Sequence, residues 1–205
     1  MLRTYITTIP LQGKFDLECV RYERRKPKTD PIPTCFPIVQ VLADTAEPGD
    51  EVRVLAIRQL NGDTARNYAL LVKELGRHGV SEQQITTIPM AENQESSTLL
   101  ELCEALVSAL PERTRVYTCI TFGTKSIPVV QLTALSCAEK IRRELEIGGI
   151  YYGEIRRENG EIRSASLNDV GVLYHMGGLV SQMQTGEDAQ AMMRHLLWLE
   201  RRGEG

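Results

Sequence analysis

The sequence is poor in aromatic residues, in charge of one sign and in long apolar runs. Phe, Trp and Tyr make up 5% of the 205 residues, which favours an aliphatic core of the α/β type. Lys and Arg number 24 and Asp and Glu 27, so the net charge of −3 argues against coating long duplex nucleic acid. No apolar run is long enough to span a membrane, and no signal peptide is predicted. A small anionic ligand in a local basic pocket is compatible with this composition.

Metal-binding and nucleophile motifs are also missing. The five cysteines are an odd number and none are at CxxC spacing, so neither a disulfide framework nor a zinc knuckle is expected. This cysteine usage favours a reducing cytoplasm. The three histidines form no HExxH or HxH pattern, and no GxSxG sequence occurs. We therefore expect no metal site, no cofactor and no hydrolase triad.

Apolar segments alternate with turn signals along most of the chain. Asp63 is a candidate cap for the second helix, Asn159-Gly160 predicts a hairpin turn, and Asp169 is a candidate cap for the segment that follows. The expected strands span residues 2–9, 14–24, 51–57, 84–90, 115–121, 149–156 and 162–166, and the expected helices span 36–43, 64–77, 98–110 and 127–145.

This alternation predicts a Rossmann-like, doubly wound α/β fold with a mainly parallel sheet. The strand at 162–166 would return as an antiparallel edge strand of a hairpin. We expect this domain to cover residues 1–167 and a short helical segment to cover 168–205, with helices near 169–184 and 186–201. In such a sheet, ligands bind beyond the carboxyl ends of the strands.

One loop at that edge combines several features of an anion site. Thr121-Phe122 leads into Gly123, which permits close backbone approach, and Thr124, Lys125 and Ser126 supply hydroxyls and a positive charge before a helix. The alternative is an ordinary turn in which Ser126 caps the helix and Lys125 is solvated. The loop matches neither the P-loop nor the GxGxxG pattern, and no acidic residue ends the second strand, so NAD is disfavoured.

Three other loops should reach the same edge. Thr7 and Thr8 end the first strand, where their hydroxyls could meet the same ligand, although threonine is also common in strands. Asn61 follows the second strand of the parallel set. The loop Glu92-Asn93-Gln94 follows the third, and its amides could contact a base or ribose, unless the loop is only a solvated helix cap.

The run CITFGTKSIPVVQLTALSCAEKIRRELEIGGIYYGEI resembles the second signature of CRISPR-associated Rossmann-fold (CARF) domains. These domains have an apolar strand, a polar Gly/Thr/Lys/Ser loop, a long helix and a strand ending near a Tyr-Tyr-Gly sequence. The following NDVGVLYHMGGLVSQMQTGEDAQAMMRHL segment is similar to the helical part after that strand. Ile120 stands where the family usually has an acidic residue or asparagine before the loop. The resemblance spans nearly the whole chain, but its specific part is about 35 residues.

The resemblance implies a homodimer that binds a cyclic oligoadenylate messenger of type III CRISPR systems across its two-fold axis. Gly123, Thr124, Lys125 and Ser126 would hold phosphate and ribose. The floor of the ring site would be lined by Thr7, Thr8, Ile9 and Pro10. Adenine contacts would come from Asn61 and from the loop Glu92, Asn93 and Gln94.

Three functional interpretations follow. A ring nuclease would cleave the messenger without metal, by attack of its own ribose 2′-OH, with Lys125 and a Thr8 or Ser126 hydroxyl assisting. A binding-only sensor would relay occupancy to an effector protein through the C-terminal helices. A generic nucleotide-binding protein is the third. No arginine stands four to six residues before a histidine, so a HEPN-type RNase is not expected.

Overall fold

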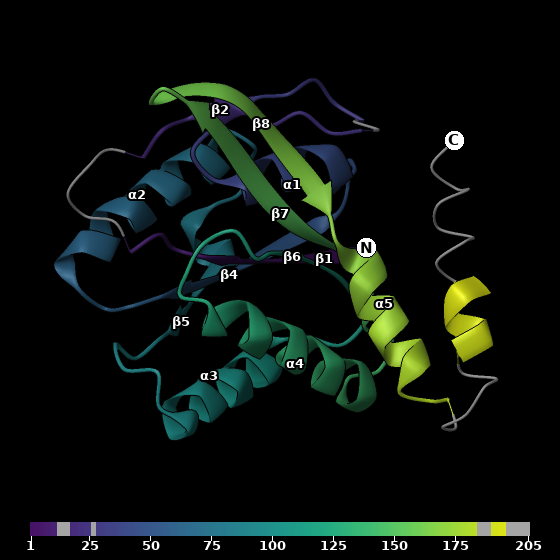
Figure 1. Cartoon of the computed structure of the whole chain (residues 1–205). Helices are drawn as coiled ribbons and strands as arrows, with labels where there is room; N and C mark the ends of the chain where they lie inside the picture. The colour runs from purple at the N-terminus through teal and green to yellow at the C-terminus, as the bar shows by residue number, and fades with distance from the viewer. Residues whose placement is uncertain (12–16, 26–27, 184–189, 196–205) are drawn as a thin grey trace. The chain divides into compact units, whose positions relative to one another are not determined.

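The computed structural model describes residues 1–11, 17–25, 28–183 and 190–195 (Figure 1). Its contacts divide the chain into two compact units, Met1–Asp169 and Val170–Gly205. Among the described residues, no helix combines the length and the apolarity needed to cross a membrane.

The first unit is built on a six-stranded sheet with strand order β5-β4-β1-β6-β7-β8. Five strands run parallel and β8 is antiparallel to β7, so the predicted α/β fold with an antiparallel edge strand is confirmed. The strands are β1 (Leu2–Thr8), β4 (Glu51–Arg58), β5 (Ile85–Pro89), β6 (Thr114–Cys119), β7 (Glu146–Glu158) and β8 (Glu161–Asp169).

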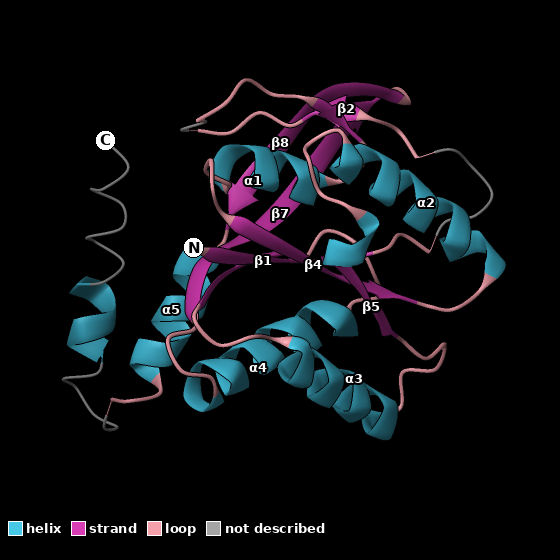
Figure 2. Cartoon of the chain, turned by 180° about the vertical axis from the view of Figure 1, so that it is seen from behind, coloured by secondary structure: helices cyan, strands magenta, loops and turns pink. Residues whose placement is uncertain are grey.

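Helices cover both faces of the sheet (Figures 1 and 2). Successive strand side chains alternate between the faces. Tyr5 and Ile9 of one face pack against α1 and α2, while Ile6 belongs to the other face, under α3 and α4. Both faces are therefore apolar, as a sheet buried on both sides requires. The helices are α1 (Pro37–Thr45), α2 (Gly62–Gly76), α3 (Ser96–Ala109) and α4 (Ser126–Ile141), and a 3₁₀ turn, η1, spans Glu82–Gln84.

The predicted hairpin turn joins β7 to β8. Asn159 and Gly160 have φ of 53° and 85°, the combination that a two-residue hairpin turn needs. β7 then passes close to α1, because a Cβ at Gly153 would lie 2.6 Å from Cγ of Pro37. Only glycine fits at this crossing.

Three local expectations are wrong. Asn61, not Asp63, caps α2: its side-chain oxygen accepts a hydrogen bond from the Thr64 N–H at 3.1 Å. The expected strand over 14–24 is reduced to β2 (Val20–Arg21), which pairs with β3 (Pro33–Thr34) in a separate two-stranded sheet. Residues 12–16 lie outside the described part. The helix expected over 127–145 ends at Ile141, because the next residues form the turn into β7.

The expectation against disulfides is also corrected. Cys19, just before β2, and Cys35, just after β3, form a disulfide bond. They are 16 residues apart, and their proximity arises from the pairing of β2 with β3, which sequence spacing does not show. Burial raises the pKa of the Cys119 thiol, so this unpaired cysteine is a packing residue.

The second unit contains α5 (Gly171–Val180) and a helical stretch over 190–195. The cap of α5 is Val170 rather than the predicted Asp169, which is the last residue of β8. The first expected C-terminal helix is thus present in shortened form, and most of the second lies outside the described residues.

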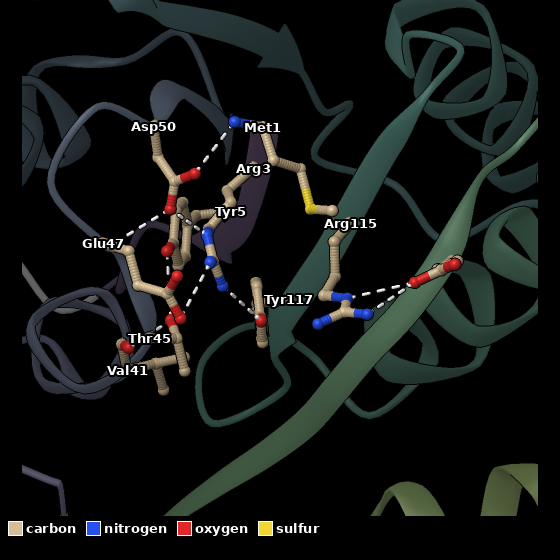
Figure 3. Close-up of polar contacts among 10 residues, drawn as sticks. Met1, Arg3, Tyr5, Val41, Thr45, Glu47, Asp50, Arg115 and Tyr117 are labelled. Carbon is tan, nitrogen blue, oxygen red and sulfur yellow. Dashed lines mark hydrogen bonds and ion pairs between the residues drawn. The ribbon is translucent and has the colours of Figure 1, made fainter.

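A polar network surrounds Arg3 at the amino end of β1 and joins it to Asp50, just before β4, and to Tyr117 of β6 (Figure 3). The buried guanidinium of Arg3 donates to Asp50 and, at 3.0 Å, to the Tyr117 hydroxyl, and it lies 3.3 Å from a Glu47 carboxylate oxygen. The Met1 ammonium is 3.0 Å from the same Asp50 carboxylate. Burial raises the pKa of Asp50, but hydrogen bonds from Glu47 N–H, Met1 and Arg3 outweigh it and lower the pKa to about 2.

Candidate functional site at the carboxyl edge of the sheet

The parallel strands β1 and β6 lie side by side at the point where the order of strands in the sheet reverses. The strands β4 and β5 follow β1 on one side, whereas β7 and β8 follow β6 on the other. The loops after β1 and β6 therefore diverge, and their divergence marks the place where doubly wound sheets bind ligands. The predicted residues Thr7–Pro10 and Thr121–Ser126 lie at this switch point.

The loop from β6 to α4 has the backbone that its sequence predicts. Gly123 adopts a φ of +105°, and a Cβ there would lie 3.1 Å from Cγ2 of Thr8 and 3.2 Å from Cβ of Ile127. The conformation therefore favours glycine, and a Cβ would fit only if Thr8 or Ile127 shifted by a few tenths of an ångström. Lys125 is the residue before α4, and its side chain is exposed, with no hydrogen bond or ion pair among the described residues.

Gln94 joins this loop to the loop after β5. Its side-chain oxygen accepts hydrogen bonds from the Thr124 hydroxyl, at 2.7 Å, and from the Ser126 hydroxyl. The two hydroxyls lie 3.0 Å from each other. Strands β4 and β1 separate β5 from β6 in the sheet, so this contact is made by the loops and helices alone. The structure thus brings together Gln94, Thr124 and Ser126, next to Lys125; we call these four residues the polar cluster.

The residues at the end of β1, which were expected to line the ligand site, are not accessible to solvent. Thr7, Thr8, Ile9 and Pro10 are all buried, so none of their side chains is open to solvent in this structure. Thr7 and Thr8 also point to opposite faces of the sheet, and Thr8 is the one beside Gly123. Within the described part of the chain, neither hydroxyl has a hydrogen-bond partner, although both are buried. Unpaired buried hydroxyls are rare in proteins, and they leave hydrogen-bonding capacity unused at this edge.

Several other predicted contact residues already have structural partners. Asn61 caps α2, and the Asn93 side-chain oxygen accepts a hydrogen bond from the Thr98 hydroxyl at 2.7 Å. The Thr121 hydroxyl accepts a 2.7 Å hydrogen bond from Gly153 N–H and so ties β6 to β7. Phe122 packs edge-on against Phe36. Glu92 is exposed on its loop.

Sequence reasoning missed Arg58, the last residue of β4. Its guanidinium lies 4.3 Å from the centre of the Tyr68 ring, and its buried Nε has no hydrogen-bond partner in the part of the chain that the structure describes. Because Arg58 directly follows the apolar run of β4, its place at the carboxyl edge could have been found from the strand boundary alone.

An apolar groove between α3 and α4 borders the polar cluster. Its volume is about 390 Å³, and its wall includes Ser126 of the cluster. Leu100 and Val129 stand exposed beside it, at 69% and 62% of their full accessibility. The remaining lining residues are Ser96, Leu99, Cys103, Val130 and Thr133.

No set of three metal-ligating side chains occurs at this edge in the described part of the chain. The one group of this kind among all described residues is Cys19, Cys35 and Glu74. The carboxyl edge can therefore offer a ligand hydroxyls, a lysine charge and the amino end of a 16-residue helix, a combination suited to an anion.

Fold and site together define an α/β protein with an anion-compatible loop cluster at the switch point of its sheet. No protein-family model and no curated protein matches the sequence.

Proposed function

We propose that the chain binds a cyclic oligoadenylate, with cyclic tetra-adenylate as the first candidate, between two copies of itself. The polar cluster carries the proposal, because it gathers two hydroxyls and one exposed lysine at the switch point. A helix amino end and a lysine favour phosphate, and hydroxyls and amides suit ribose and adenine edges. The resemblance to CARF domains supplies the ligand class and a role in type III CRISPR antiviral signalling.

The groove between α3 and α4 supports the dimer. A second copy seated on Leu100 and Val129 would cover two exposed apolar side chains and place its own polar cluster near the first. A two-fold axis would then present each loop twice, as a ring of repeated nucleotides requires.

Cleavage of the ring is the second candidate. The lysine charge at Lys125 could stabilise the phosphorane formed when a ribose 2′-OH attacks the adjacent phosphorus. However, the Thr8 hydroxyl is buried and the Ser126 hydroxyl is bonded to Gln94. These contacts support binding more directly than cleavage, which makes a sensor that acts through an effector protein the stronger of the two candidates. The exposed Leu173 and Leu179 of α5 are the surface that such an effector would contact.

The deciding experiment measures binding and turnover in one preparation. Cyclic tetra-adenylate and cyclic hexa-adenylate are titrated by calorimetry in EDTA, and the mixtures are then resolved by chromatography. We expect one ring per two chains. Intact ring would support the sensor and linear product the ring nuclease, whereas no binding of either ring would contradict the proposal.

The Lys125→Ala variant tests the polar cluster itself. Loss of a charge-assisted contact costs about 1.5–3 kcal/mol, so binding should weaken by roughly tenfold or more. Lys140→Ala is the matched control, because Lys140 is an exposed lysine at the other end of the same helix. Equal affinity of the two variants would contradict a role for Lys125.

The Val129→Asp variant tests the dimer. It should convert the dimer to monomer in light scattering and abolish ring binding with it. Ile162→Asp, at a half-exposed position in the hairpin, is the control and should leave both unchanged. A Val129→Asp protein that stays dimeric would place the interface elsewhere.

A further inference from the structure

The Cys19–Cys35 disulfide lies in a setting that the candidate ligand site does not use. It joins the two strands of a sheet whose backbone pairing extends over only two residue pairs. The two sulfurs differ in access, because Cys19 is exposed while Cys35 is 2% exposed. The Cys19 side of the bond is therefore the more accessible one to a thiol from solution.

A pocket of about 480 Å³ opens beside the disulfide. Both cysteines line it, and α2 adds Arg66 and Lys73 to its wall. The volume lies within the range of small-molecule sites, and the two cationic residues favour an anionic ligand. Apolar atoms of Leu17 and Leu70 complete the wall and could cover an aliphatic chain.

The surroundings also suit the reduced form of the cysteine pair. The Leu17 carbonyl oxygen lies 3.5 Å from Sγ of Cys35, and a Glu74 carboxylate oxygen lies 3.8 Å from Sγ of Cys19. Each sulfur thus faces an acceptor that could take a hydrogen bond from an S–H group after reduction. Glu74 is held in place by the Cys35 N–H, at 3.1 Å, and by the Thr34 hydroxyl. Both acceptors therefore already lie beside the sulfurs before reduction.

From these observations we infer that the pocket is a thiol–disulfide exchange site for a small carboxylate-bearing thiol, with Cys19 as the attacked sulfur. The thiolate forms a bond to Sγ of Cys19, and the Cys19–Cys35 bond breaks. Its electron pair leaves on Sγ of Cys35, which takes a proton from water. A second thiol then attacks the mixed disulfide, which leaves two protein thiols and one oxidised small-molecule disulfide. This site is separate from the polar cluster and does not rest on the proposed ligand.

The test uses glutathione as the probe. The folded full chain is equilibrated in buffers of graded reduced and oxidised glutathione, quenched with acid, alkylated and analysed by peptide mass spectrometry. We expect reversible loss and return of the Cys19–Cys35 bond and, within this pair, glutathione attached to Cys19 alone. In Cys35→Ser the adduct should accumulate at Cys19, whereas in Cys19→Ser the buried Cys35 should stay unmodified.

Charge dependence separates a built pocket from an ordinary exposed disulfide. The double variant Arg66→Gln/Lys73→Gln should slow reduction by glutathione about tenfold, since steering by local charge is of that order. Reduction by the uncharged 2-mercaptoethanol should change less than about twofold. Equal slowing with both thiols, or an adduct at Cys35, would overturn the inference. So would tightly held zinc that protects both cysteines from alkylation until a chelator is added, because Glu74 and the two sulfurs would then be metal ligands.

Discussion

The two ends of β1 and β6 contrast in how their polar groups are satisfied. At the amino edge, Arg3, Asp50 and Tyr117 form a closed network with the Met1 ammonium. At the carboxyl edge, the Thr7 and Thr8 hydroxyls are buried without partners, and Lys125 has no partner among the described residues. One edge of the sheet thus serves stability, while the other keeps hydrogen-bonding capacity that folding does not use.

Breaking the amino edge should have the largest effect on stability. Arg3→Ala leaves the Asp50 carboxylate without its buried cation, and losing one partner of a buried pair costs about 3 kcal/mol. Urea unfolding followed by circular dichroism measures this loss. Arg115→Ala is the control, because the Arg115–Glu146 pair is exposed and should contribute under about 1 kcal/mol. Similar losses in the two variants would contradict the buried role of Arg3.

The next largest loss of stability is expected from a change in the backbone at the carboxyl edge. Gly123→Ala should cost about 1–3 kcal/mol, because alanine is strained at a φ of +105° and its Cβ would contact Thr8 and Ile127. Thermal unfolding measures this cost. Gly62→Ala is the matched control, since the space around Gly62 is open and its φ is not positive. An unchanged Tm for Gly123→Ala would mean that the loop relaxes without strain.

Thr4 and Thr8 lie on one face of β1 and allow the two edges to be compared by their effect on stability. Thr4 shares a 2.9 Å hydrogen bond with Thr114, so Thr4→Val should cost about 1 kcal/mol. The Thr8 hydroxyl has no hydrogen-bond partner in the described ranges, so Thr8→Val should be neutral or stabilising by up to about 1 kcal/mol. Chemical denaturation of both variants gives the comparison. If Thr8→Val destabilises as much as Thr4→Val, its hydroxyl is satisfied in solution.

A further effect is the response of the amino edge to acid. Because the folded pKa of Asp50 is lowered to about 2 from an ordinary value near 4, its contribution is complete above that ordinary value. It is then lost as the pH falls toward 2. The stability advantage of the wild-type chain over Asp50→Asn should therefore shrink across this range, as followed by urea midpoints. An advantage that is constant with pH would contradict the lowered pKa.

Much of the site could be predicted because its parts are local. Gly123, Lys125 and Ser126 lie in one short loop, and their position between a strand and a helix follows from the apolar pattern on either side. The contact of Gln94 with Thr124 could not be predicted, since it joins loops from strands that are not neighbours. The burial of Ile9 and Pro10 depends on packing around the end of β1, so it could not be predicted from the local sequence pattern either.

The succession of strands and helices along the chain, the hairpin turn and the glycine of the β6–α4 loop could be read from the sequence, because periodicity and backbone conformation are local properties. Tertiary structure alone decided which side chains remain available. In the folded chain, Asn61 caps a helix and the Thr121 hydroxyl bonds to the backbone of the neighbouring strand. The fold also brings Cys19 next to Cys35. The physical reason is that hydrogen-bond partners and sulfur pairs are selected by distance in space, which the chain specifies only when the whole sheet and its helices have packed.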